Sequence, residues 1–225
     1  MEKEWEKFGI YKGKLRVDGS MALILMNMQV DYGDPERGSR FVSGYQGDRY
    51  SFPIKQIVQN VARLIRLPFG VRVSSTDMHP HHKGGAVEVA ERSEYVEHCV
   101  ERTPGIKVLP EINVALSEVS SMPVRRGQDP AIFGNSISMS PDFSHLIRAL
   151  REKKISRVFF CGFPFNSAIA SSVKAIIDQH LWTNAQIFVV LDGVKSDPPP
   201  RRDPERLRDF LQWYGAYFIF ADQIC

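Results

Sequence analysis

The 225-residue sequence contains no apolar run of the roughly 18–20 residues that a membrane-spanning helix requires. Its start, MEKEWEKFGIYKGK, carries acidic side chains and has no apolar centre, which argues against a secretory signal or a transit peptide. Only three cysteines are present, Cys99, Cys161 and Cys225, too few for a disulfide framework in a chain of this length. These absences favour a reducing, intracellular compartment, first of all the cytoplasm, and leave import into an organelle open.

An excess of charge of one sign is also missing. The chain has 29 Lys and Arg against 26 Asp and Glu, a net charge of +3, and the two signs are interleaved, as in REKKISR and RRDPERLRD. A nucleic-acid-binding surface needs a basic stripe. The sequence therefore indicates no nucleic-acid partner, whereas its 43% of hydrophobic residues is enough for a substantial core.

What the chain does contain is an alternation of short apolar runs with helical patterns. The apolar runs cover residues 22–28, 71–76, 157–163, 186–192 and 216–221, and the helical patterns cover 54–66, 144–154, 167–181 and 204–215, with a shorter one at 114–120. Continuous apolar runs bounded by turn residues are typical of parallel strands covered on both faces. The sequence predicts a three-layer α/β/α fold with a doubly wound, mainly parallel, Rossmann-like sheet. We expect one domain over residues 21–225, preceded by an N-terminal extension of residues 1–20.

Candidate metal ligands follow the second predicted strand. The motif STDMHP places Asp77 and His79 two residues apart, and side chains at that spacing in extended backbone point the same way. His98, in EYVEHCVERTPG, is a third candidate. Two imidazoles and a carboxylate suit Zn²⁺, with Fe²⁺ or Mn²⁺ as alternatives. The competing interpretation is a histidine-rich surface loop, and His81 and His82 fit that interpretation better.

Five motifs carry a resemblance to a known family. They are ALILMNMQVDY, STDMHP, HCVERTPG, VRRGQDP and FFCGFPFNSA, and they cover residues 22 to about 195. In this order and at this spacing they resemble the isochorismatase-like hydrolases, specifically the nicotinamidase/pyrazinamidase branch. The resemblance implies a doubly wound parallel sheet, and it implies that Asp77, His79 and His98 are metal ligands.

The same resemblance implies a catalytic triad of Asp, Lys and Cys, but this chain holds Asn27, Arg126 and Ala168 at the three positions. In the family a thiolate attacks an amide carbonyl, the Asp shuttles the proton and ammonia leaves. Ala168 offers only a methyl group, and Asn27 cannot accept and return a proton near neutral pH. Arg126 keeps the positive charge but has a planar fork and a very high pKa.

Pro164 changes a fourth position. The resemblance implies that this residue, after an unusual cis peptide, gives a backbone N–H to the oxyanion hole, and proline has none. Losing one such donor typically costs roughly 2.7–4 kcal/mol of transition-state stabilisation. No replacement nucleophile stands out, because Ser167 comes one position early in the predicted helix, Cys161 lies within a strand and His145, in a helical pattern, resembles a surface or packing residue.

The sequence therefore predicts a nicotinamidase-like pseudoenzyme that keeps its divalent-metal site. The resemblance implies ring-binding walls at Tyr32 and Tyr95, for which ordinary core packing is the alternative, and Arg126 nearby can grip a carboxylate. Both a pocket for a small aromatic acid and a metal kept only for folding agree with this pattern. The alternative function is an active hydrolase of C–N amide bonds that uses a metal-bound water.

Several segments are candidates for contacts with partner chains. Members of the family commonly self-associate, so the resemblance implies a homo-oligomer or a subunit of a larger assembly. Residues 33–53 are rich in Gly, Arg and Tyr without periodicity, which predicts a surface loop able to form an interaction surface. Residues 1–20 and 213–225 are further candidates for such contacts.

Overall fold

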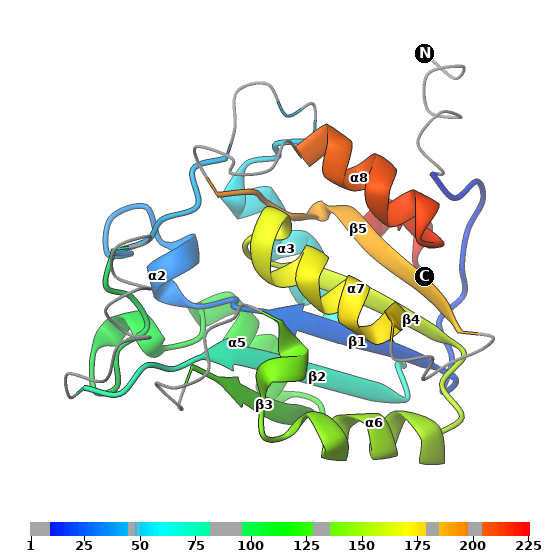
Figure 1. Cartoon of the computed structure of the whole chain (residues 1–225), viewed down its shortest axis with the longest axis horizontal. Coiled ribbons are helices and arrows are strands. Elements are labelled where there is room, and N and C mark those ends of the chain that lie inside the picture. The colour runs from blue at the N-terminus through cyan, green and yellow to red at the C-terminus, as the bar shows by residue number, and fades with distance from the viewer. Residues whose placement is uncertain are drawn as a thin grey trace.

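The computed structural model describes residues 10–44, 48, 50–81, 96–127, 136–178, 185–197 and 204–225. Its strands are β1 (Met21–Met26), β2 (Val71–Asp77), β3 (Met122–Arg126), β4 (Arg157–Gly162), β5 (Gln186–Val194) and β6 (Ala216–Ile219). They form a parallel sheet in the order β3-β2-β1-β4-β5-β6 (Figure 1). The predicted doubly wound α/β fold is confirmed.

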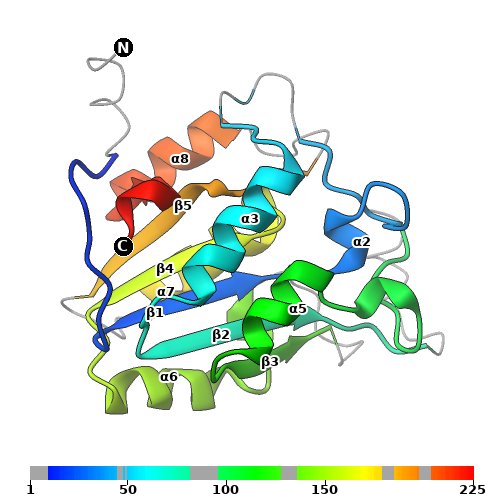
Figure 2. The same cartoon turned by 180° about the vertical axis from the view of Figure 1, so that it is seen from behind.

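Helices cover both faces of this sheet. One face carries α3 (Ile54–Ile65) and α5 (Pro110–Ser117), and the other carries α6 (Phe143–Glu152), α7 (Ala170–Asp178) and α8 (Pro204–Trp213), as the two opposite views show (Figures 1 and 2). A single turn, α2 (Val30–Gly33), follows β1. None of the helices in the described residues has both the length and the apolar character needed to cross a membrane.

Strand β1 shows why the central apolar runs are continuous. Ala22, Ile24 and Met26 enter the core on one face of the sheet, and the alternate residues Leu23 and Leu25 enter the core on the other. Because successive side chains of a strand point to opposite faces, a strand covered on both sides must be apolar at every position. The prediction of 22–28 as a buried strand rested on this property.

Strand β3 was not predicted from the sequence. In its sequence MPVRR, Pro123 and Arg125 are exposed, while Val124 and Arg126 are buried. An edge strand needs only one covered face and tolerates proline, so it lacks the apolar run that marks a central strand. β3 pairs with β2 in a register that sets Arg126 beside Asp77.

The first described residues lie along the opposite edge of the sheet. Tyr11 N donates to Phe218 O in β6 at 2.7 Å, and Leu15 N donates to Gln223 O at the same distance. Leu15 and Val17 are buried in the core. Residues 10–17 therefore pack against the C-terminal segment and cover the β6 edge.

Candidate metal centre and substituted triad

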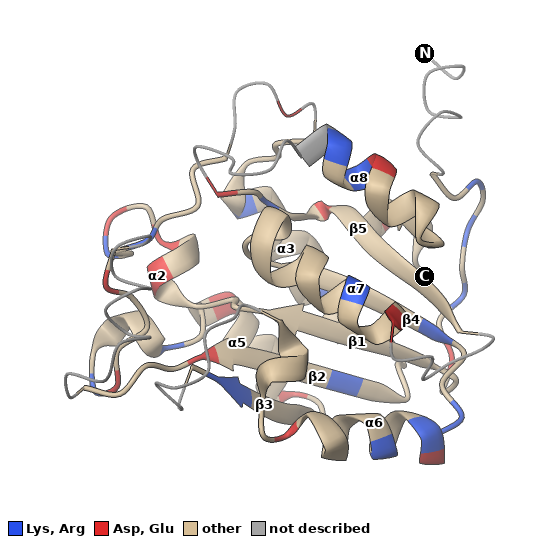
Figure 3. Cartoon of the chain, in the orientation of Figure 1, with Lys and Arg blue, Asp and Glu red and all other residues tan. Residues whose placement is uncertain are grey.

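The carboxyl ends of four neighbouring strands bring the predicted site residues together. The register sets Met26, the last residue of β1, beside Gly162 of β4 and beside Ser75 of β2, and it sets Asp77 beside Arg126. In Figure 3 the basic end of β3 lies next to the acidic end of β2. Ligand sites of open parallel sheets form at this edge, so the topology places the candidates where chemistry is expected.

Asp77, His79 and His98 form one cluster, with their ligand atoms all within 4.8 Å of one another. Asp77 Oδ1 lies 3.5 Å from His79 Nε2, and Asp77 Oδ2 lies 3.5 Å from His98 Nε2. Donors bound at about 2.1 Å to one tetrahedral Zn²⁺ stand roughly 3.4 Å apart. The donor types and their spacing therefore fit a divalent metal.

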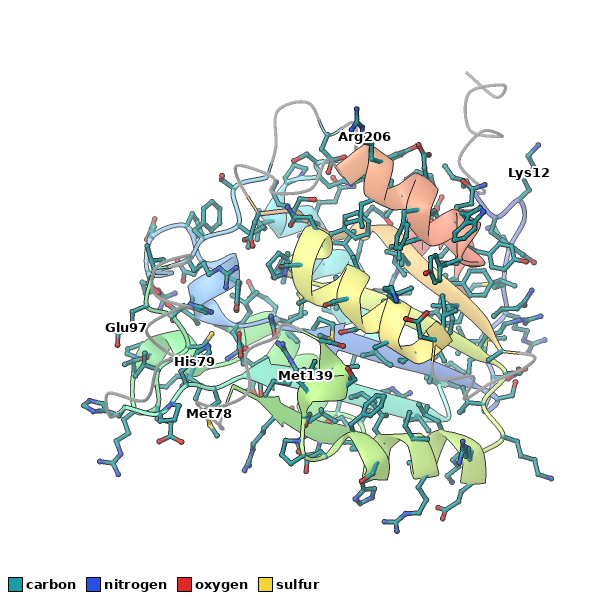
Figure 4. All side chains as sticks on the ribbon, in the orientation of Figure 1. Lys12, Met78, His79, Glu97, Met139 and Arg206 are labelled. Atoms are coloured by element: carbon teal, nitrogen blue, oxygen red, sulfur yellow. The ribbon has the colours of Figure 1, made fainter. Side chains whose placement is uncertain are left out.

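A short backbone bridge joins the segments that carry the two histidines. His79 N donates to Cys99 O at 2.9 Å, and Glu101 N donates to His79 O at 2.8 Å. Figure 4 shows His79 and Glu97 at the same end of the molecule, with Lys12 at the far end. This pairing explains how His98 reaches a site that begins at the end of β2. Of the neighbouring histidines, His81 is exposed as predicted, and His82 lies outside the described residues.

Gln29 holds the backbone of Asp77, the first candidate metal ligand, in place. Asp77 N donates to Gln29 Oε1 at 2.7 Å, and Gln29 Nε2 donates to Asp77 O at 2.8 Å and to Ile106 O at 2.9 Å. The amide is fully buried and ties the end of β2 to the turn after His98. Sequence reasoning missed this role, and the only signal was the place of Gln29 in the motif NMQVDY.

Asp31 holds the His98 segment from the other side. Its Oδ2 accepts from Cys99 N at 2.6 Å, and its Oδ1 accepts from Ser39 N at 2.9 Å. A Cβ atom at Gly105 would lie 2.0 Å from Asp31 Oδ2, so this close approach requires glycine. Asp31 is therefore a positioning residue for the metal cluster.

Tyr32 contacts the candidate ligands directly. Its hydroxyl donates to Asp77 Oδ2 at 2.8 Å, and its ring meets the His98 ring edge to face at 5.5 Å. Burial, and then the Asp77 charge, raise the pKa of Tyr32 well above its usual range, so the phenol stays a neutral donor. The predicted ring-binding role of Tyr32 stays a prediction, and Tyr95 lies outside the described residues.

The charge of Asp77 is stabilised inside the protein. Burial by itself raises the pKa of this carboxyl, but the Arg126 guanidinium, and after it a contact with His79, outweigh burial and hold the pKa well below its usual range. Asp77 is therefore an ionised carboxylate at neutral pH, which is the form that a metal ligand needs.

Arg126 and Asn27, at two positions where the resemblance implies triad residues, bind each other. Arg126 is 1% exposed, its Nη2 donates to Asn27 Oδ1, and its Nε donates to Ser75 Oγ at 3.2 Å. Asn27 Nδ2 is buried and has no hydrogen-bond partner among the residues that the structure describes. A neutral amide thus holds the guanidinium where the resemblance implies a proton-shuttling carboxylate.

Ala168 lies in a π-helix, Phe165–Ile169, that begins directly after Pro164. The Ala168 methyl group is fully buried in the core. All peptide bonds of the described residues are trans, so Pro164 does not reproduce the cis peptide that the resemblance implies. Ser167 Oγ is buried without a hydrogen-bond partner in this part of the chain, so no described base contacts it.

The remaining candidates for a nucleophile are inert or remote. Cys161 is fully buried, and burial, then the Asp192 charge, raise the pKa of its thiol well above the usual range. Burial likewise raises the pKa of Cys99. His145 is exposed on α6, which favours the surface over the packing alternative. A thiolate is therefore not available from either buried cysteine at neutral pH.

Arg40 enters the site from the segment that the sequence analysis interpreted as a surface loop. It is 7% exposed, its Nη1 donates to His98 Nε2 at 2.9 Å, and its Nη2 donates to Asp197 Oδ2 at 2.8 Å. Burial raises the pKa of Asp197, and the Arg40 charge partly offsets this rise. The partners are 58 and 157 residues away along the chain, so no local pattern indicated Arg40.

Comparisons with family models and with curated proteins find no match. Solved structures do match. PnC1 of Leishmania infantum in complex with nicotinate has a TM-score of 0.73 at 16% identity, covering 94% of this chain and 98% of that one. Pyrazinamidase of Pyrococcus horikoshii in complex with zinc has a TM-score of 0.65 at 21% identity, covering 89% and 99%.

An isochorismatase-like hydrolase from Alkaliphilus metalliredigens matches with a TM-score of 0.59 at 14% identity, covering 90% of this chain and 93% of that one. These likenesses extend over nearly the whole of both chains in each pair. They show that the chain has the fold of nicotinamidases, pyrazinamidases and isochorismatase-like hydrolases, as the five sequence motifs implied.

Proposed function

We propose that this chain is a nicotinamidase-like protein that no longer hydrolyses amides and that binds a divalent metal together with a small aromatic acid. The observation that carries the proposal is a contrast at one sheet edge. The donors of Asp77, His79 and His98 are gathered within 4.8 Å. The triad positions hold a methyl group, an amide and a guanidinium instead of Cys, Asp and Lys.

The substituted positions offer no group for amide hydrolysis. Ala168 supplies no nucleophile, and Asn27 cannot take the proton that a nucleophile would release. Pro164 has no N–H to donate to a developing oxyanion. The buried thiol of Cys161, whose pKa is raised, does not replace the missing group.

The ligand class follows from the groups that the chain retains. A divalent metal, when bound, supplies a Lewis-acidic position for a ring nitrogen or a carboxylate. Zinc is the first candidate, because two imidazoles and one carboxylate are typical zinc donors and a similarly folded pyrazinamidase was solved with zinc; iron and manganese are the alternatives. The fold's likeness to a PnC1 solved with nicotinate supports a small aromatic acid as the ligand.

Three side chains of this chain would hold the acid. Tyr32 presents an aromatic ring beside His98, and Tyr95 is the second proposed wall. Arg126 would exchange its hydrogen bond to Asn27 for a ligand carboxylate, a stronger charge-assisted bond. Binding without turnover suits a ligand sensor or a regulatory subunit.

The experiment compares the natural chain with the triple variant Asn27→Asp, Arg126→Lys, Ala168→Cys. Metal content, binding of nicotinate by calorimetry, and ammonia release from nicotinamide and pyrazinamide are measured for both proteins. We expect the natural chain to hold metal, to bind nicotinate in a manner that chelation abolishes, and to release no ammonia. Ammonia release by the natural chain that stops on chelation would instead establish the alternative hydrolase with a metal-bound water.

The proposed role includes assembly into a homo-oligomer or a larger complex. Helix α8 exposes Trp213 (81%) and Phe210 (38%) on its outer side, which is more apolar surface than a helix facing only water needs. Light scattering of the natural chain and of Trp213→Glu tests this part. A monomeric natural chain would refute self-association and leave the ligand proposal untouched.

A further inference from the structure

Arg40 brings a permanent positive charge into contact with a candidate metal ligand. Its Nη1 lies 2.9 Å from His98 Nε2, and its side chain is only 6% exposed. A guanidinium is protonated at every accessible pH, so it always donates and never accepts. His98 Nε2 must therefore be the acceptor in this contact.

The second ring nitrogen of His98 agrees with this assignment. His98 Nδ1 lies 2.8 Å from the carbonyl oxygen of Val96, and a carbonyl can only accept, so Nδ1 carries the ring proton. Nε2 then holds the one in-plane lone pair of the ring, and it lies 3.5 Å from Asp77 Oδ2. A metal ion and the Arg40 N–H need this same lone pair, so the two contacts exclude each other.

Arg40 is held in place from three directions. Its other terminal nitrogen donates to Asp197 Oδ2 at 2.8 Å, and its guanidinium lies 5.3 Å from the centre of the Tyr32 ring. Its backbone N donates to Asp31 O at 3.0 Å. Asp197 is itself fixed, because its backbone N donates to Asn166 Oδ1 at 2.8 Å. The contact of Arg40 with His98 is thus part of a network of hydrogen bonds and a ring contact that fixes the guanidinium.

We propose that Arg40 is an internal counter-cation that occupies His98 until a divalent metal displaces it. This inference rests on the proposed metal site and adds a control of metal affinity by the chain itself. Metal uptake must break the Arg40–His98 hydrogen bond and bring a divalent charge close to a buried guanidinium, and both effects weaken binding. Residues 39–44, which carry Arg40, loosen when the metal enters.

The test is a calorimetric titration of the full chain with Zn²⁺, repeated with Co²⁺ and followed by its visible absorption. The variant is Arg40→Gln, and the matched control is Arg37→Gln, which removes the same charge from an exposed side chain (69%) of the same segment. Because a change in the surroundings of a ligand typically shifts metal affinity 10–100-fold, we expect Arg40→Gln to bind about 10–100-fold more tightly. Arg37→Gln should bind as the natural chain does.

Two further measurements separate the possible outcomes. The gain in Zn²⁺ affinity must vanish in the double variant Arg40→Gln, His98→Gln. In the natural chain, the backbone amide protons of Arg40 and Val42 must exchange with solvent faster when Zn²⁺ is present than when it is absent. If Arg40→Gln does not fold, Arg40→Lys, which cannot span His98 and Asp197 with one fork, replaces it and must also bind more tightly.

Equal Zn²⁺ affinity of the natural chain and the Arg40 variant would refute the proposed role of Arg40 as a counter-cation. It would not affect the proposal of a metal site. Absence of Zn²⁺ binding in every protein tested would overturn both this inference and the metal part of the proposed function. Zn²⁺ binding by both proteins, with the Arg40 variant binding more tightly, would support both.

Discussion

The candidate metal cluster and the positions where the resemblance implies a catalytic triad share one edge of one sheet and have opposite chemical character. The cluster of Asp77, His79 and His98 has three donors, one of which is the ionised carboxylate of Asp77. The triad positions carry Asn27 and Ala168, which can neither attack nor take up a proton. Under the proposed function this scaffold keeps the groups that bind and lacks the groups that react, so that binding and reaction would depend on separable side chains.

The two regions are nevertheless coupled through Arg126. This guanidinium lies at a position where the resemblance implies a triad lysine, and its charge is the main influence that lowers the pKa of Asp77 against the effect of burial. Because Asn27 is neutral, it accepts a hydrogen bond from Arg126 without cancelling the charge. A neutral amide at position 27 thus leaves more positive potential at Asp77 than a carboxylate there would leave.

The largest effect is expected from Asp77→Ala, which removes the carboxylate of the cluster. Tyr32 and Arg126 lose their buried anionic partner, so we expect Zn²⁺ binding to disappear and the free energy of unfolding to fall by about 3–5 kcal/mol. Zinc calorimetry and urea unfolding measure the two quantities. Asp209→Ala, an exposed position on α8, is the control and should change neither.

Arg126→Met should destabilise the protein by about 2–3 kcal/mol at pH 7, since it removes charge-assisted hydrogen bonds and uncovers the Asp77 charge. The folded-state pKa of Asp77 is depressed, so its contribution to stability is full above the unfolded pKa of about 3.9 and is lost as pH falls through the folded value. In Arg126→Met this pKa rises.

The variant should therefore lose less stability between pH 5 and pH 2 than the natural chain does, and the two unfolding curves should converge in acid. Urea unfolding with a chelator present, at several pH values, provides the comparison. A difference in unfolding free energy that stays constant down to pH 2 would show that Arg126 does not act through Asp77.

Gly105→Ala tests the positioning of the His98 segment. The added Cβ would lie 2.0 Å from the Asp31 carboxylate, so we expect a loss of about 1–3 kcal/mol in stability together with weaker Zn²⁺ binding. Gly19→Ala is the matched control, because nothing lies within 4 Å of its added Cβ. Unchanged zinc affinity in Gly105→Ala would separate Asp31 from the metal cluster.

The smallest effect concerns the cysteines. Under native conditions iodoacetamide should label Cys225, which is exposed, and leave Cys99 and Cys161 unmodified, since burial raises the pKa of both thiols. Mass spectrometry of the native and the urea-unfolded chain measures the difference. Rapid native labelling of Cys161 would point to a relocated nucleophile and weaken the contrast between the two regions.

Local patterns predicted the elements that local forces determine. Short runs bounded by turn residues marked β1, β2, β4, β5 and β6, whereas β3 has Val124 as its one buried apolar residue and was not predicted. The short helical pattern at 114–120 begins earlier in the structure, at Pro110, a residue favoured at the first helical turn. The helix predicted at 167–181 is divided, because its first turn is the π-helix Phe165–Ile169 and α7 begins only at Ala170.

The candidate site was predictable to the same degree. Spacing and motif resemblance indicated Asp77, His79 and His98, which the structure brings together. They gave no sign of Gln29 or Arg40 as supporting residues. Gln29 acts on Asp77 from 48 residues away, and Arg40 acts on His98 from 58 residues away, and such contacts depend on the path of the whole chain.

The sequence by itself determined what chemistry is absent. A methyl group at Ala168 and an amide at Asn27 have no nucleophilic or proton-accepting atom, and folding cannot supply atoms that the residues lack. Only the tertiary structure decided which charged side chains lie close to one another and to the candidate metal ligands. Burial removes the water that would screen Arg126 from Asp77, and it is the fold that places Arg40 against His98. The same residues spread along an extended chain would not influence one another.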